Sequence, residues 1–109
     1  MTEQVNADKM MQQAAKLAKK SLFKSPDYIE AANLYNDAAK RYTLDGCHTK
    51  AGEALSLAAS TISKEDMDLN AGVYSRDAAA CYIKGIVNGC EGSTAEKVVS
   101  MYKQASHYF

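Results

Sequence analysis

The sequence Asp37-Ala38-Ala39-Lys40-Arg41-Tyr42 decides the fold, because its pattern returns as Asp77-Ala78-Ala79-Ala80-Cys81-Tyr82 after 40 residues. A second element, Gly-Cys followed by five residues and Glu, occupies residues 46–53 and returns at 89–96, after 43 residues. Each unit is therefore predicted to be a helix, a tight glycine turn and a second helix, with alanines where two helices approach closely. A chance match between alanine-rich helices is the alternative, and the shared order of both elements counts against it.

Helical periodicity divides the chain into five predicted helices. They cover residues 3–20, 26–44, 48–62 and 69–87, and a last stretch that begins after a cap at Ser93 or Thr94 and continues almost to the C-terminus. Glycines at 46 and 89 suit the left-handed C-caps of the second and fourth helices. Because no segment alternates with the period of two that a strand requires, we predict an all-α protein. Its expected architecture is a tetratricopeptide-like right-handed stack of about five antiparallel helices.

The length of 109 residues predicts one helical-repeat domain that folds without disulfide or metal staples. Residues 1–24 form its leading helix and an apolar tip, residues 25–62 the first helix pair and residues 63–109 the second. The polar, acidic segment 63–68 is interpreted as the connector between the pairs.

The chain's single proline marks the start of the second helix. Proline suits the first helical turn and pushes the residue before it toward an extended conformation, so Ser25 is predicted to be the N-cap and Pro26 the first helical residue. The preceding tip exposes an apolar pair beside lysines, which makes it the candidate functional surface. The candidate membrane-contact residues are Leu22, Phe23, Lys20 and Lys24.

Charge and motif content exclude several function classes. Thirteen basic residues balance thirteen acidic ones, and aromatic residues are not interleaved with basic ones, so nucleic acid is not an expected partner. Three cysteines without a CxxC pair predict reduced thiols in a cytosolic protein rather than a disulfide framework or a zinc site. The sequence also lacks a phosphate-binding loop and a nucleophile motif, so we expect no metal, no cofactor and no enzymatic activity.

The order of these features resembles the N-terminal region of the soluble NSF attachment proteins (SNAPs), most closely the gamma branch. The matching features are an N-terminal helix that ends in lysines, the Leu22-Phe23 tip, the start at residues 24–28, and Glu30-Ala31-Ala32-x-x-Tyr35-x-x-Ala38-Ala39. The resemblance covers roughly residues 10–109, and beyond residue 60 it rests on helix spacing.

The resemblance implies an adaptor in vesicle fusion that brings the fusion ATPase to SNARE complexes and binds SNARE coiled coils. It also implies a cytoplasmic, peripheral membrane protein whose loop after the first helix touches the bilayer, a role that carries over to Leu22 and Phe23. SNAPs are about three times longer than this chain, and nothing in these residues matches the C-terminal part that engages the ATPase.

Other interpretations remain open at this point. Leu22 and Phe23 are also suited to a hydrophobic staple, for example against Ile29. The stack is equally suited to a peptide-binding scaffold without a membrane role, or to a bundle that self-associates through its apolar tip, and the oligomeric state is left undetermined. The tyrosines at 28, 35 and 42 are predicted to pack between helices rather than to bind a ligand.

Overall fold

The computed structural model describes residues 3–19 and 25–109, and these residues are almost entirely helical. The elements are α1 (Glu3–Ala18), α2 (Tyr28–Leu44), α3 (His48–Ile62), the short 3-10 helix η1 (Ser63–Glu65), α4 (Asp68–Val87) and α5 (Ala95–Tyr108). Within these described ranges there is no β-strand. The prediction of an all-α protein built from five α-helices is confirmed.

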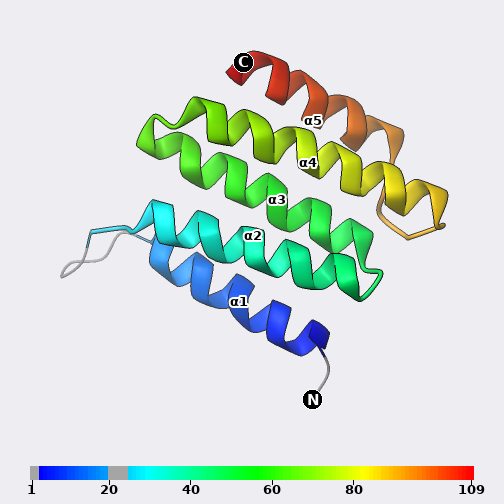
Figure 1. Ribbon diagram of the computed structural model, residues 1–109, viewed down its shortest axis with the longest axis horizontal. Helices are drawn as coiled ribbons and strands as arrows, with labels where there is room; N and C mark the ends of the chain where they lie inside the picture. Colours follow the sequence, from blue (N-terminus) through cyan, green and yellow to red (C-terminus); the bar gives the residue numbers. More distant parts are fainter. Residues whose placement is uncertain (1–2, 20–24) are drawn as a thin grey trace.

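The helices form a sheet in which each packs against its neighbours in the chain (Figure 1). Successive helices run antiparallel, with α1 at one edge and α5 at the other. The sheet measures 44 × 39 × 16 Å, which is little thicker than one α-helix with its side chains. Most residues of such a sheet therefore lie near a surface, and the core is confined to the seams between adjacent helices.

Alanines and tyrosines fill these seams, as the repeat pattern predicts. Ala38 and Ala78 are fully buried at equivalent places of the two repeats, and Tyr42 and Tyr82 are almost fully buried one turn later. Small side chains let the helix axes approach, while the tyrosine rings supply most of the buried apolar area. The predicted tyrosine stripe is thus core for Tyr35 and Tyr42, and half-buried at Tyr28.

The two predicted glycine caps are present. Gly46 has φ of 76° and Gly89 has φ of 70°, in the left-handed region that glycine adopts without steric cost. After each of them a cysteine N–H donates to a carbonyl five residues earlier, from Cys47 to Tyr42 at 2.8 Å and from Cys90 to Gly85 at 2.7 Å. Both bonds belong to the Schellman type of helix end.

The second half of each repeat is less regular than the sequence suggests. Helix α3 begins directly after Cys47, whereas α5 begins only after four further residues, where Thr94 caps it by accepting a hydrogen bond from the Lys97 N–H at 3.2 Å. Glu53 therefore lies in the second turn of α3 and Glu96 in the first turn of α5. The match of the Gly-Cys-x₅-Glu element is correct for the glycine turn and wrong for the glutamates.

The predicted start of the second helix is also wrong, by two residues. Asp27, not Ser25, is the N-cap, and its carboxylate accepts a hydrogen bond from the Glu30 N–H at 3.1 Å. Pro26 stands before the cap rather than in the first turn. The Asp27 N–H donates to Leu17 O at 2.8 Å, so a contact with α1 fixes where α2 begins.

Candidate functional site

The predicted membrane-contact residues Leu22, Phe23, Lys20 and Lys24 lie outside the described residues. The structure does describe the base from which this segment extends. The hydrogen bond from Asp27 N–H to Leu17 O joins the end of α1 to the start of α2, and Leu17 packs against a core cluster drawn from α1, α2, α3 and α4.

Several other elements end at the same side of the sheet as this base (Figure 1). Lys64, in η1 directly after α3, lies with its Nζ 5.2 Å from the centre of the Tyr28 ring. The connector between α3 and α4 also brings Glu65, Asp66 and Asp68 to this side, all exposed. This side of the sheet therefore carries carboxylates as well as lysines, a feature that the charge count of residues 1–24 alone does not show.

A groove runs between α2 and α4, over the inner face of α3. It has a volume of about 400 Å³, and the nearly buried Leu55 of α3 contributes to its apolar surface. The lining residues are Asn36, Ala39, Lys40, Thr43, Leu44, Leu55 and Asp77. Polar groups stand on both sides of an apolar strip, which is the usual composition of a surface that binds a peptide or another protein.

Tyr74 of α4 lies within electrostatic reach of two carboxylates near this groove, Asp37 on α2 and Asp77 on α4. Burial raises the pKa of its phenol, and the negative charges of Asp37 and Asp77 raise it further. The two aspartates that occupy equivalent places in the sequence repeat therefore act on one tyrosine. The spacing alone suggests that the repeat holds them far apart.

The cysteines form no disulfide. All three are free and partly buried. Burial raises the pKa of the Cys81 thiol, while a hydrogen bond with Thr43 opposes that rise. Within the described parts of the chain, no group of three or more His, Cys, Asp or Glu side chains is gathered as a metal site requires.

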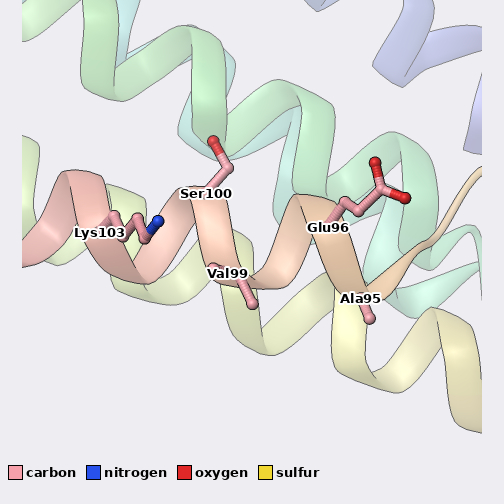
Figure 2. Close-up of a pocket in the computed structure, with 5 residues that line it drawn as sticks. All are labelled: Ala95, Glu96, Val99, Ser100 and Lys103. Atoms are coloured by element: carbon pink, nitrogen blue, oxygen red, sulfur yellow. The ribbon is translucent and has the colours of Figure 1, made fainter.

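The outer face of α5, at the edge of the sheet, is a surface that sequence reasoning missed. It carries a shallow hollow of about 480 Å³ lined by Ala95, Glu96, Val99, Ser100 and Lys103, and Figure 2 shows these side chains along one side of the helix. The available signal was the spacing of apolar residues on the side of α5 opposite Met101. As for membrane insertion, none of the helices in residues 3–19 and 25–109 has the length and apolarity to span a bilayer.

Together, the one-layer sheet of antiparallel helices and its internal repeat define a helical-repeat protein. The family model for "Soluble NSF attachment protein, SNAP" matches residues 5–109 of the chain. Because this match covers nearly the whole sequence, the chain belongs to the SNAP family, a family of adaptors rather than enzymes. Comparisons with curated proteins and with solved structures gave no significant match.

Proposed function

We propose that this protein is a SNAP-like adaptor module that acts in vesicle fusion and SNARE complex disassembly, without enzymatic activity of its own. The observation that carries the proposal is the family match over residues 5–109, together with the five-helix stack. Its partners are SNARE coiled coils and the fusion ATPase, and its place is the cytoplasmic surface of a membrane. Within the family we assign it to the gamma branch, on the features around residues 20–42.

The shape of the protein supports a coiled-coil partner. A sheet of 44 × 39 × 16 Å presents broad faces for its mass, and a rod-shaped bundle can lie along such a face over several helices. The groove between α2 and α4 exposes an apolar strip on one face of the sheet, with Lys40 and Asp77 among the polar residues that line it. Binding there would combine apolar burial with charge pairing to a mixed-charge partner.

Membrane contact is proposed for the tip, with Leu22 and Phe23 inserted and Lys20 and Lys24 near lipid head groups. Each apolar side chain gains about 1.5–3 kcal/mol at full burial, and each lysine near an anionic surface gains about 1 kcal/mol. The carboxylates of the 63–68 connector stand at the same side of the sheet and oppose this attraction. Such a contact is weak alone, and we expect it to act when a SNARE partner already holds the protein.

Liposome flotation in the presence of SNARE complex tests the tip. We expect the wild-type chain to float with the vesicles and the Leu22→Ser/Phe23→Ser variant to stay largely in the bottom fraction. Ile86→Ser/Val87→Ser is the matched control, because these two side chains are 44% and 78% exposed and lie in the last turn of α4, away from the groove. Equal flotation of the tip variant and the wild type would exclude the tip as the contact.

The connector carboxylates provide a second, electrostatic test. The variant Glu65→Gln/Asp66→Asn removes two negative charges from the connector between α3 and α4, and asparagine tolerates the left-handed backbone of Asp66, whose φ is 56°. We expect more protein to float with anionic vesicles and no change with neutral phosphatidylcholine vesicles. A loss of flotation, or an equal gain on both lipids, would contradict an electrostatic role for this side of the sheet.

The groove favours one second candidate function, a peptide-binding scaffold without a membrane role. In that case the chain would retain short peptides from a fluorescent library, and Lys40→Glu, at the groove, would release them. Lys16→Glu is the matched control, because Lys16 is exposed on α1 and away from the groove. Peptide retention that depends on Lys40, with no recovery of SNARE complex, would replace the adaptor proposal.

A further inference from the structure

Cys47 and Cys90 occupy equivalent places of the two repeats, each directly after the glycine that ends a helix. Cys47 is the N-cap of α3, and Cys90 lies in the connector between α4 and α5. Figure 1 shows that the α2–α3 turn and this connector lie at the same side of the sheet, opposite the start of α2. The repeat therefore brings its two glycine-cysteine turns to neighbouring positions.

Hydrogen bonds hold the α4–α5 connector against the start of α3. The Thr49 hydroxyl, in the first turn of α3, donates to Glu91 O at 3.0 Å. The same hydroxyl oxygen lies 2.6 Å from the hydroxyl oxygen of Ser93. Because residues 91 and 93 are both bonded to Thr49, the position of Cys90 relative to the α2–α3 turn is fixed by contacts on its C-terminal side.

The two thiols contact successive carbonyls of the α2–α3 turn. Cys47 Sγ lies 3.9 Å from Asp45 O, and Cys90 Sγ lies 3.9 Å from Gly46 O. Since a peptide oxygen lies about 3 Å from the Cα of the next residue, the Cys90 sulfur stands within about 7 Å of the Cys47 Cα. A disulfide needs Cα atoms about 4.4–6.8 Å apart. Neither cysteine lies inside a helix, so a small shift of the connector brings the two sulfurs together without breaking a helix.

The third cysteine is placed differently. Cys81 lies within α4, where its thiol bonds with the Thr43 side chain and burial raises its pKa. Cys47 and Cys90 are the two cysteines that share a turn, and both are free and partly exposed. The geometry therefore selects one pair out of the three that three cysteines can form.

We propose that Cys47 and Cys90 form a redox-sensitive pair, which a small-molecule disulfide such as glutathione disulfide converts into an intrachain disulfide bond. One protein thiolate attacks the small disulfide, which gives a mixed disulfide and releases one small thiol. The second protein thiolate then attacks the protein sulfur of the mixed disulfide and releases the other small thiol. The protein loses two electrons and two protons, the small disulfide takes them up as two thiols, and an excess of small thiol reverses the reaction.

The bond joins loops that belong to different repeats. In the reduced protein the two repeats meet along the seam between α3 and α4. A link between residues 43 apart in the chain restricts the unfolded ensemble, so we expect the oxidised protein to resist unfolding more than the reduced protein does. The inference goes beyond the proposed adaptor function and does not depend on the tip, on lipid or on SNARE proteins.

Peptide mapping after equilibration of the protein with reduced and oxidised glutathione tests the inference. Free thiols are blocked with N-ethylmaleimide, and trypsin then separates the three cysteines into the peptides 42–50, 77–84 and 85–97. We expect the link between 42–50 and 85–97 to be about tenfold or more as abundant as either link to 77–84, because neighbouring thiols have a high effective concentration. On a non-reducing gel the linked protein should run at the monomer mass of 11.8 kDa.

Serine variants provide the controls. Cys81→Ser should form the link as fully as the wild type, and its oxidised form should unfold at a higher urea concentration than its reduced form. Cys47→Ser and Cys90→Ser should stop at the mixed disulfide with glutathione, and oxidation should leave their urea midpoints unchanged. Circular dichroism checks that each variant keeps its helices.

Three results would overturn the proposal. The first is a link to Cys81 as abundant as the link between Cys47 and Cys90. The second is a link found only between separate chains, which the gel shows as a dimer. The third is an oxidised Cys81→Ser protein that carries the link and unfolds no later in urea than its reduced form.

Discussion

At one edge of the sheet α1 turns Lys9, Gln12 and Lys16 to solvent, whereas at the other edge α5 turns out Val99 and Tyr102. Both helices have one neighbour and one free side. The side of α1 away from α2 is thus polar, whereas the side of α5 away from α4 carries exposed apolar residues. The chemistry of each outer side therefore depends on the residues it carries and not on the helix's place in the stack.

The two outer helices also differ in the side-chain contacts that hold them to their neighbours. The Tyr42 hydroxyl donates a short hydrogen bond to the Asp8 carboxylate, and this bond ties α1 to α2. At the other edge the Gln104 side-chain amide donates to the buried Ser75 hydroxyl at 2.9 Å, and Lys97 lies over the Tyr82 ring. A lysine lies over each repeat tyrosine, Lys50 over Tyr42 and Lys97 over Tyr82, so the two differ in the hydroxyl bond that Tyr42 makes to Asp8.

The largest effect is expected at alkaline pH, because burial raises the pKa of both repeat tyrosines. For Tyr82, burial, followed by the charge of Glu53, raises the pKa to about 12 from an ordinary value of 10, so the unfolded chain releases this proton first. The associated stability is complete below pH 10 and is lost as the pH rises toward 12. Over that range the wild type should lose about 2–3 kcal/mol more than Tyr82→Phe does. Urea unfolding at a series of pH values measures both, and parallel curves would refute the assignment.

Removing single hydroxyls compares the two tyrosines directly at neutral pH. Tyr42→Phe leaves the part-buried Asp8 carboxylate without this donor and should cost about 1.5–3 kcal/mol. Tyr82→Phe keeps the ring against Gly52 and under Lys97, so its cost should stay below about 0.5 kcal/mol. Hydrogen exchange should show faster opening of α1 amides in Tyr42→Phe alone. Equal losses of unfolding free energy in the two variants would mean that the Tyr42–Asp8 hydrogen bond does not stabilise the packing of α1 on α2.

The smallest effects are expected at the helix caps. Thr94→Ala removes the side-chain acceptor at the start of α5 and should cost about 1 kcal/mol. Cys47 occupies the same cap position before α3, but its side chain makes no capping hydrogen bond to the described residues of that helix. Cys47→Ala should therefore cost less than Thr94→Ala when both are measured by urea unfolding. The reverse order would show that the thiol matters more than the cap.

Sequence reasoning succeeded where the signal is local. The glycines at 46 and 89, the polar connector and the alternation of alanine with tyrosine fix helix ends and buried faces within a few residues. It failed at Ser25, because the cap position depends on the hydrogen bond from the Asp27 N–H to Leu17 O, which lies on another helix and ten residues earlier in the chain. It also failed at Glu53 and Glu96, because the connectors after the two glycine turns differ in length.

The candidate surfaces were harder to predict than the fold. The tip was found from its composition, and its contact with membrane stays a prediction. The groove was missed because Thr43, Leu55 and Asp77 come from three helices and meet only when α2 and α4 pack over α3.

The sequence by itself determined that this chain forms antiparallel helices of defined length, because propensity, capping and periodicity act over a few residues. Only the tertiary structure decided which faces those helices share. It placed Asp8 beside Tyr42 and brought Thr43, Leu55 and Asp77 together in the groove. These outcomes depend on side chains far apart in the chain, and their contacts exist only after the helices have packed.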